Sequence, residues 1–269
     1  MSIWESPITL LNLKYWVTAP SHNRYGLEKS GRSLILWAFI GLGQSGVLWA
    51  PIDSSKSDVF MPPTSMLDED LRKTLLKVAQ FYDQRKVAHK GYLGFRQSSD
   101  LTRLVGCVDH LIQHSLLIPQ QSLFLDMGCA DGRVNVLLSY VVRQSVGIEV
   151  HEWILEEYAP LKRGLEGVLR EHHLRRPPHN ISLLHGDTLD EAVHEIMTER
   201  TGRALEEFDL FYTYLSMHEE FAELIAQKAK RGAVFMIYGL ERVLPKLDGL
   251  QLLTPGKLIQ GTIALYQKV

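Results

Sequence analysis

Residues 123–133 restrict the fold of this chain more than any other part of it. They read LFLDMGCADGR, an apolar run that ends in an acidic residue and is followed by a turn of small residues. Apolar residues then recur at helical spacing over residues 134–142. This order predicts a buried parallel strand, a tight turn and a helix whose N-terminus faces a ligand above the turn. Gly128 and Gly132 let the backbone adopt positive φ angles or pass close to that ligand.

The turn resembles a known motif. The spacing Asp126-x-Gly128-x-Ala130-x-Gly132 is similar to the first motif of class I S-adenosylmethionine-dependent methyltransferases, whose usual form is Asp/Glu-x-Gly-x-Gly-x-Gly. Ala130 stands at the middle glycine and is the smallest replacement for it. The resemblance implies an α/β fold with a doubly wound, mostly parallel seven-stranded sheet and a C-terminal antiparallel hairpin. It also implies S-adenosylmethionine as the cofactor, with S-adenosylhomocysteine as the product.

The chain beyond this turn alternates strand-like apolar runs with helical patterns, which is typical of a parallel α/β sheet. Further strands are expected at residues 145–150, 181–185, 208–215 and 233–238, and an antiparallel hairpin within residues 250–269. One long helix is expected after the second strand.

The helices after the third and fourth strands carry start signals of their own. Thr188-x-x-Glu191 and Ser216-x-x-Glu219 both match the capping box, in which two side chains satisfy backbone N–H groups at a helix N-terminus. We therefore expect these helices to begin at the two boxes.

The sequence divides into three segments by pattern. Residues 1–64 form an N-terminal extension rich in aromatic residues, which could be a lid or substrate region but is better interpreted as packed core. Residues 65–119 form a helical segment, with one helix from Ser65-x-x-Asp68 and a second over residues 100–116. Residues 120–269 form the cofactor-binding core. Three residues of the loop between the two helices are lid candidates: Tyr92, Phe95 and Arg96.

Charge and cysteine content limit the function. The 269-residue chain has a formal net charge of −2, which argues against a nucleic-acid-coating protein. Two cysteines cannot form a disulfide framework, so we expect a reducing, cytoplasmic setting.

Residues 33–52 carry no charge and are as long as a membrane span, but their central glycines favour a β-hairpin or packed loop. The G-x-G-x-x-G match at residues 41–46 precedes no helical pattern and is interpreted as a turn.

Acidic residues follow successive strands, where ligands bind in open α/β sheets. Glu149 comes about 20 residues after the glycine turn, a position from which a carboxylate can accept from a ribose diol. Asp187 could accept from an adenine amino group, and Asp126 could order the turn or meet a ligand ammonium. Three acids around one pocket favour a cationic ligand over a pyrophosphate. The full set of expected cofactor-binding residues is Asp126, Gly128, Cys129, Ala130, Gly132, Glu149, Val150, Asp187 and Thr188.

The segment after the fourth strand is expected to face the methyl acceptor. Tyr212, Tyr214 and His218 are the catalytic candidates, because a tyrosine hydroxyl can orient an amine and a histidine can act as a base. Alternate tyrosines facing the core remain the structural alternative. The segment lacks the Asn/Asp-Pro-Pro-Tyr pattern of nucleic-acid amino-methylating members of the resembled family. We therefore expect an N or O acceptor on a small molecule or a protein side chain, and no nucleic acid.

A weaker likeness concerns layout alone. The long helix after the second strand and the extended segment of residues 175–185 are similar to Dot1-like protein lysine methyltransferases, whose paired asparagines after the fourth strand are absent here.

No metal site is expected, because His110 and His114, spaced as on one helical turn, have no evident third ligand. Two alternatives stay open: a non-catalytic module of this fold that binds a partner, and a membrane-associated protein lysine methyltransferase. The oligomeric state is left undetermined.

Overall fold

The computed structural model describes residues 16–18, 24–30, 33–38, 67–85, 90–91, 94–95, 99–240, 244–254 and 257–269. By its internal contacts the chain divides into two compact units, Met1–Pro62 and Pro63–Val269. The lid candidates Tyr92 and Arg96 lie outside the described residues. Of Phe95 only the backbone is described, in the short pair β4 (Lys90–Gly91) and β5 (Gly94–Phe95).

The first unit contains a three-stranded antiparallel sheet in the order β1-β2-β3. Its strands are β1 (Trp16–Thr18), β2 (Arg24–Ser30) and β3 (Ser33–Ala38). The uncharged stretch at residues 33–52 therefore begins as a strand, and that strand pairs with the preceding β2. Residues 39–52, with the G-x-G-x-x-G match, lie outside the described residues.

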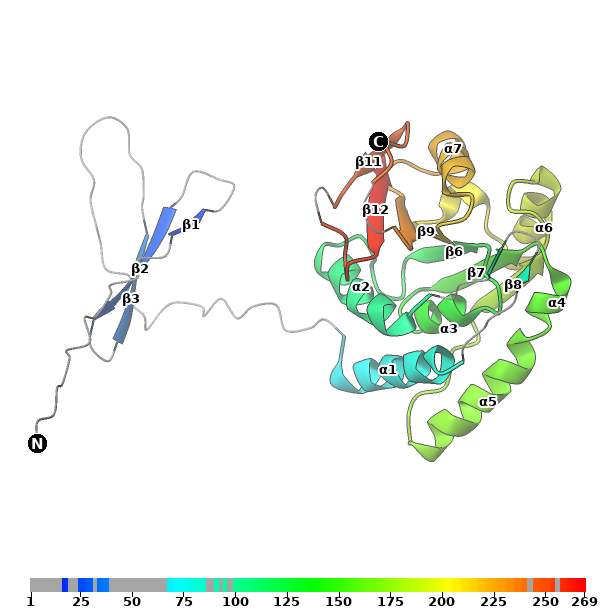
Figure 1. The fold of residues 1–269 in the computed structure, drawn as a ribbon, viewed down its shortest axis with the longest axis horizontal. Coiled ribbons are helices and arrows are strands. Elements are labelled where there is room, and N and C mark those ends of the chain that lie inside the picture. Colours follow the sequence, from blue (N-terminus) through cyan, green and yellow to red (C-terminus); the bar gives the residue numbers. More distant parts are fainter. Residues whose placement is uncertain are drawn as a thin grey trace, which may run out of the picture. The chain divides into compact units, whose positions relative to one another are not determined.

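The second unit is built on a seven-stranded sheet in the order β11-β12-β10-β9-β6-β7-β8 (Figure 1). The strands are β6 (Leu123–Met127), β7 (Gln144–Glu149), β8 (Ile181–His185), β9 (Leu210–Tyr214), β10 (Val234–Tyr238), β11 (Leu250–Leu252) and β12 (Ile263–Lys268). β8, β7, β6, β9 and β10 run parallel to one another, whereas β12 is antiparallel to β10 and β11 to β12. The predicted fold class is confirmed.

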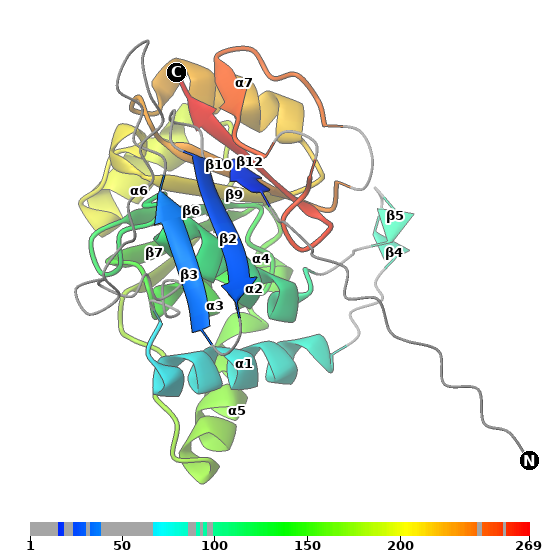
Figure 2. The same cartoon turned by 90° about the vertical axis from the view of Figure 1, so that its left-hand side faces the viewer.

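Helices cover both faces of this sheet (Figures 1 and 2). They are α1 (Glu69–Asp83), α2 (Leu101–Gln113), α3 (Arg133–Ser139), α4 (Glu152–Leu155), α5 (Tyr158–Glu171), α6 (Glu191–Thr201) and α7 (His218–Lys228), with a 3-10 turn at Leu205–Glu207. One buried apolar cluster joins α1, α2, α3 and α5 to the sheet, and a second joins α6 and α7 to it.

Alternate residues of each central strand belong to opposite clusters. In β6, Phe124 faces the α1–α2–α3–α5 side, whereas Leu123 and Leu125 face the α6–α7 side. Side chains of a strand alternate between faces, so a sheet with helices on both faces needs continuous apolar runs. Asp126 has the parity of Phe124 and therefore belongs to the α1–α2–α3–α5 side.

Of the two N-terminal helices of this unit, α2 begins where the sequence predicted, whereas the N-cap of α1 is Asp68, the last residue of the Ser65-x-x-Asp68 signal rather than its first. Asp68 caps α1 by accepting from Leu71 N at 2.7 Å, and Asp100 caps α2 by accepting from Arg103 N at 3.1 Å. Asp83, at the end of α1, also accepts from the N–H groups of Leu101 and Thr102 at the start of α2. One carboxylate thus links the end of α1 to the start of α2.

The long helix expected after β7 is divided, which corrects the sequence prediction. α4 ends at Leu155 and α5 begins at Tyr158. Pro160 is the third residue of α5, where its missing N–H is tolerated. In a continuous helix the proline ring would clash with the Glu156 carbonyl, so the chain restarts there instead.

Both predicted capping boxes are also wrong. α6 is capped by Asp190, which accepts from Ala192 N at 3.0 Å, whereas Thr188 is buried before the helix. The residue at the N-cap of α7 is Met217, in a left-handed conformation (φ 54°) and without a side-chain cap. In each case the tertiary position of the loop, rather than the local pattern, decides where the helix starts.

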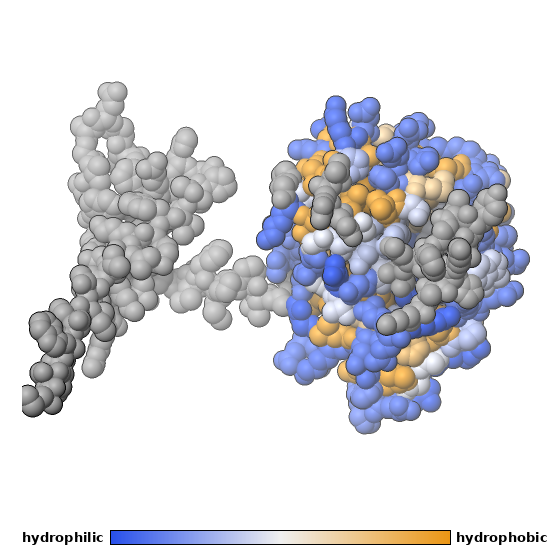
Figure 3. Space-filling model, in the orientation of Figure 1, coloured by the Kyte–Doolittle hydropathy of each residue, from blue (hydrophilic) through white to orange (hydrophobic). Residues whose placement is uncertain are grey.

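The described surface gives no sign of a membrane span. Within the described residues, no helix combines the length and apolar character that a span requires. Figure 3 shows hydrophilic residues over most of the coloured surface that faces the viewer, with hydrophobic residues in separate patches.

Replacing Asp83 with alanine should lower the free energy of unfolding by about 1–2 kcal/mol, because the N–H groups of Leu101 and Thr102 in the first turn of α2 lose their acceptor. Urea denaturation followed by circular dichroism measures this. Asp70→Ala, at an exposed acid of the same helix, is the matched control and should change the value by less than about 0.5 kcal/mol. Equal effects of both substitutions would contradict the role given to Asp83.

Candidate active site

The glycine turn after β6 is held by the end of β7. The carbonyl oxygen of Ile148 accepts from the N–H groups of Gly128 and Cys129, each at 2.9 Å. Gly128, Ala130 and Gly132 all have left-handed backbones, with φ angles of 86°, 53° and 72°. The alternation of small residues in the sequence therefore corresponds to an alternation of backbone conformation, which residues without a large Cβ substituent adopt most readily.

Two glycines, Gly132 at the end of the turn and Gly147 on the neighbouring strand β7, leave room for the side chains of other residues. A Cβ on Gly132 would lie 2.7 Å from Leu183 Cδ1 and 2.9 Å from Tyr158 Cδ2. A Cβ on Gly147, within β7, would lie 2.8 Å from Cys129 Sγ. The sequence analysis missed Gly147, although a glycine inside a strand often marks the close approach of another backbone.

Ala130→Gly should stabilise the protein, since alanine in a left-handed conformation costs about 1–2 kcal/mol. The extra freedom of glycine in the unfolded chain offsets about 0.4–1 kcal/mol of this gain. The free energy of unfolding should therefore rise by roughly 0.5–1 kcal/mol. Thermal or urea denaturation measures it.

Gly132→Ala should lower the free energy of unfolding, and by more than Ala130→Gly raises it, because backbone strain and steric overlap add. Gly202→Ala is the matched control, since Gly202 has a similar φ of 68° but open space around it. If Gly132→Ala cost no more than Gly202→Ala, the close packing around the turn would be excluded as the reason for Gly132.

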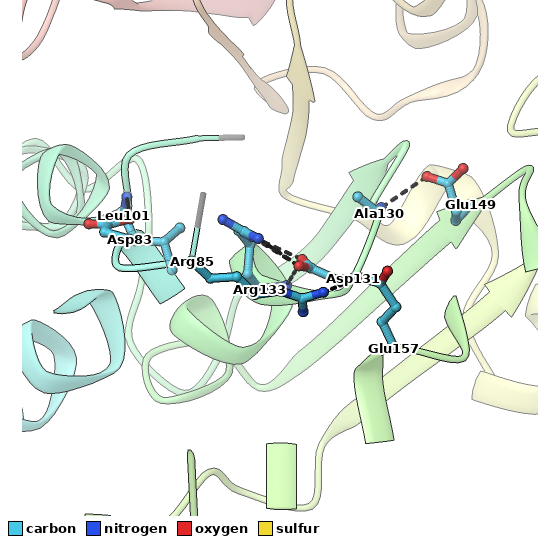
Figure 4. A network of polar contacts seen from close by, with 8 residues as sticks. All are labelled: Asp83, Arg85, Leu101, Ala130, Asp131, Arg133, Glu149 and Glu157. Carbon is cyan, nitrogen blue, oxygen red and sulfur yellow. Dashed lines mark hydrogen bonds and ion pairs between the residues drawn. The ribbon is translucent and has the colours of Figure 1, made fainter. Parts of the chain in front are cut away.

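Glu149 connects the end of β7 to the glycine turn. Its Oε2 accepts from Ala130 N at 2.9 Å (Figure 4). Its Oε1 accepts from His151 N at 3.0 Å. The side chain is buried, and the next residue, Val150, is exposed. Each carboxylate oxygen can accept more than one hydrogen bond, so Glu149 keeps acceptor capacity for a ligand.

Asp187 and Thr188 follow β8 at the same edge of the sheet. Glu149 is paired with His185 in the β7–β8 register, and Gly186 N donates to the Glu149 carbonyl at 3.0 Å. Asp187 is exposed, and its Oδ1 accepts from Leu189 N at 2.9 Å. Thr188 is buried, and its carbonyl accepts from His194 Nε2 at 2.7 Å. Asp126, Glu149 and Asp187 thus lie at the carboxyl ends of β6, β7 and β8, along one edge of the sheet.

Asp126 is the most buried of these acids, with 2% of its surface exposed. It lies between Gly147 on β7 and Tyr212 on β9 in the strand register. Within the described part of the chain, its side chain forms no hydrogen bond or ion pair. Burial raises the pKa of the Asp126 carboxyl well above its ordinary value, and the nearby carboxylates of Glu149 and Asp131 raise it further.

Asp131 and Arg133 form a buried ion pair beside the turn. Arg133 Nε donates to Asp131 Oδ1 at 2.9 Å and Arg133 Nη2 to Asp131 Oδ2 at 2.7 Å (Figure 4). The guanidinium carbon lies 5.6 Å from the ring centroid of Tyr82 on α1. A second contact, Arg85 Nη2 to Glu157 Oε2 at 2.9 Å, links the residues after α1 to the start of α5. Neither ion pair was predicted from the sequence, because no motif marks them.

The three catalytic candidates lie at different depths. Tyr212 is buried, and its hydroxyl is hydrogen-bonded to Ser99 Oγ, just before α2. Tyr214 is half-buried, with its ring centroid 5.5 Å from that of Tyr238. His218 is half-buried, and its Nδ1 lies 2.8 Å from the Leu215 carbonyl oxygen. Because a carbonyl only accepts, Nδ1 must carry the hydrogen, which leaves the lone pair of a neutral imidazole on Nε2.

No group of three or more metal-ligating side chains gathers anywhere in the described ranges. The imidazole rings of His110 and His114 are neighbours on α2, with centroids 4.2 Å apart. They are not joined there by a third ligand.

Asp126→Asn should remove a pH-dependent loss of stability. The folded-state pKa of Asp126 is raised above the unfolded value of about 3.9, so its stabilising contribution is complete below that pH and is lost as the pH rises toward the folded-state pKa. Without ligand, wild type should therefore lose about 1.4 kcal/mol relative to the variant for each pH unit in this window.

Denaturant unfolding between pH 4 and pH 8 tests this difference. Asp187→Asn, at an exposed acid of the same edge, is the control and should show no such trend. A constant difference between wild type and Asp126→Asn across the range would contradict the assignment.

Comparison with known proteins gives similarity of fold. No protein-family model matches the sequence, and no curated protein matches it either. Among solved structures, an RNA methyltransferase from Salinibacter ruber in complex with S-adenosyl-L-homocysteine is 15% identical, with a TM-score of 0.38, over 60% of this chain and 90% of that one.

Two further solved structures are similar in the same way. A putative methyltransferase from Escherichia coli is 14% identical, with a TM-score of 0.41, over 64% of this chain and 87% of that one. A precorrin-8w decarboxylase from Methanobacterium thermoautotrophicum is 17% identical, with a TM-score of 0.38, over 65% and 93% of the respective chains. The names of these proteins include different reactions, so the similarity concerns the fold and leaves the reaction open.

Proposed function

We propose that this protein is an S-adenosylmethionine-dependent methyltransferase that acts on an N or O acceptor. The observation that carries the proposal is the meeting of three acids, Asp126, Glu149 and Asp187, at the carboxyl ends of three adjacent parallel strands. They surround a left-handed glycine turn at the N-terminus of α3. Ligands of open α/β sheets bind at this edge.

Each acid suits a different part of the cofactor. Asp126 is buried beneath the turn and pairs with no cation among the described residues, so it suits the ammonium group. Glu149 lies at the end of β7 and keeps acceptor capacity for the ribose hydroxyls. Asp187, Thr188 and the exposed Val150 lie where the adenine would be held. Gly128, Cys129, Ala130 and Gly132 let the backbone pass close to the ligand.

The balance of charge favours a cationic ligand over a dinucleotide. Arg133 is the only basic residue within residues 126–133, and it is bound to Asp131 through two nitrogens. A pyrophosphate would therefore meet carboxylates without a free cation from this turn. A sulfonium or ammonium group instead gains from these carboxylates.

The reaction needs little chemistry from the protein. The cofactor supplies a methyl group on a sulfonium, which is a good leaving group. The chain's own residues hold the reactants in line and exclude water. His218 Nε2 carries a lone pair and is the candidate base for an acceptor that begins protonated. Tyr214 is half-buried and can orient the acceptor, whereas the buried Tyr212 hydroxyl is bonded to Ser99 and suits a positioning role.

The surroundings of the candidate base support a small-molecule or protein acceptor rather than a nucleic acid. The first turn of α7 carries the exposed acids Glu219 and Glu220, and Leu215 and Met217 before it are exposed apolar residues. The two carboxylates would repel a phosphate backbone but would attract an amine, and the apolar side chains could contact the aliphatic part of such an acceptor.

Calorimetric titration of the purified full chain with S-adenosylmethionine tests the function. Wild type should bind, and Glu149→Ala or Asp187→Ala should weaken binding about tenfold or more, because each loses a charge-assisted hydrogen bond. Glu152→Ala, at an exposed acid of α4, is the matched control and should bind like wild type. Thermal denaturation of each variant shows that a loss of affinity is not a loss of fold.

A folded wild-type protein that does not bind the cofactor would contradict the proposal that this protein is an enzyme. The interpretation would then return to a non-catalytic module that keeps this fold in order to bind a partner. Binding that no acidic substitution weakens would place the cofactor elsewhere on the protein.

A further inference from the structure

We propose that His194 is a positioning residue that makes the site selective for adenine. Through one hydrogen bond it holds the turn from which Asp187 accepts the 6-amino group of the base. The inference rests on the proposed function and adds a residue that determines the specificity of the same site. It follows from the contacts that hold the segment between β8 and α6.

His194 is buried and forms a short hydrogen bond to this segment. It is the fourth residue of α6 and is 7% exposed. Its Nε2 lies 2.7 Å from the Thr188 carbonyl oxygen. Because a carbonyl only accepts, Nε2 carries the hydrogen. It carries that hydrogen in this neutral tautomer and in the imidazolium alike, so the bond does not depend on the charge of His194.

Two successive peptide groups of the turn are held in this way. In the first, the Asp187 carbonyl accepts from Asp190 N at 3.1 Å. In the second, the Thr188 carbonyl accepts from His194, and Leu189 N donates to Asp187 Oδ1 at 2.9 Å. The Thr188 carbonyl and the Leu189 N–H belong to one planar peptide group. His194 therefore holds one end of the peptide group whose other end orients the Asp187 carboxylate.

The position of Asp187 suits recognition of an amino group. Its Oδ1 receives one N–H, and an ionised carboxylate has further acceptor sites on both oxygens. The side chain is exposed at the carboxyl edge of the sheet. His185, two residues earlier, contacts the carbonyl of the exposed Val150 through Nε2 at 3.0 Å, which joins the two sides of the expected adenine site.

A carboxylate held in one orientation can distinguish adenine from hypoxanthine. Adenine presents a donor at position 6, whereas hypoxanthine presents a carbonyl oxygen, which a carboxylate repels. A site built to accept a hydrogen bond rejects an analogue that lacks the donor. If the turn were free to rotate, Asp187 could turn away from the carbonyl, and the selectivity would fall.

Two ligands measure this selectivity. S-adenosylhomocysteine carries the 6-amino group, and S-inosylhomocysteine has a 6-carbonyl in its place and is otherwise the same. Each is titrated calorimetrically into the full chain, and the ratio of the two dissociation constants is compared between variants. Wild type should bind the adenosyl ligand about tenfold or more tightly, because the inosyl ligand lacks the charge-assisted hydrogen bond. Partial unfolding weakens both ligands by the same factor, so it does not change the ratio.

His194→Leu has no donor and should lower the ratio about threefold or more, toward that of Asp187→Ala, which lacks the carboxylate itself. His194→Gln can place an N–H near the position of Nε2 and should keep the ratio within about twofold of wild type. His194→Met is a second variant without a donor. His194 lines a cavity of about 160 Å³, which gives these side chains room.

Thr198→Val is the matched control. Thr198 Oγ1 donates to the His194 carbonyl at 2.8 Å, so this change removes a hydrogen bond of His194 that lies within α6. The ratio should be that of wild type.

The inference is overturned if the folded variants without a donor keep the wild-type ratio, or if His194→Gln loses as much selectivity as His194→Leu. It is also overturned if wild type binds both ligands equally, an outcome that leaves the proposed function standing. A folded wild-type protein that binds neither ligand would instead contradict the proposed function.

Discussion

The path of the glycine turn depends on the carboxyl end of β7. The Ile148 carbonyl accepts the N–H groups of Gly128 and Cys129, and the Glu149 carboxylate accepts that of Ala130. Without these acceptors the N–H groups of the turn would need other partners. Because β7 is also paired with β8, the same strand sets the position of Gly186 and Asp187. The candidate site is therefore held by the central sheet.

Three buried carboxyls near one another can be accommodated only if each has a different environment. Asp131 is paired with Arg133, Glu149 accepts backbone hydrogen bonds, and Asp126 has neither. Burial and the two neighbouring carboxylates raise the pKa of the Asp126 carboxyl. This division also leaves Asp126 as the acid without a partner among the described residues, which links its burial to the proposed recognition of a cation.

The helices that precede the sheet are joined to this edge by polar contacts as well as by the apolar core. Ser99 is bonded to the Tyr212 hydroxyl, and Asp100 N donates to the Tyr238 hydroxyl at 3.0 Å. Arg85 reaches Glu157 before α5, and Tyr158 then packs against Gly132. These contacts position the start of α2 and the start of α5 relative to the edge of the sheet that carries the glycine turn.

The sequence alone determined the order of strands and helices, the glycine turn and the acids after the first three strands, because these features depend on local periodicity and spacing. Residues 181–185 became β8 with no shift of boundary. The sequence analysis missed the break before α5. Tertiary structure decided the caps of α6 and α7 and the Ser99–Tyr212 bond. Pro160 offered a local signal for the break. No local pattern relates Ser99 to Tyr212, or identifies Asp126 as the acid without a partner. Burial and hydrogen bonding between distant segments, which only the folded chain brings together, decide those features.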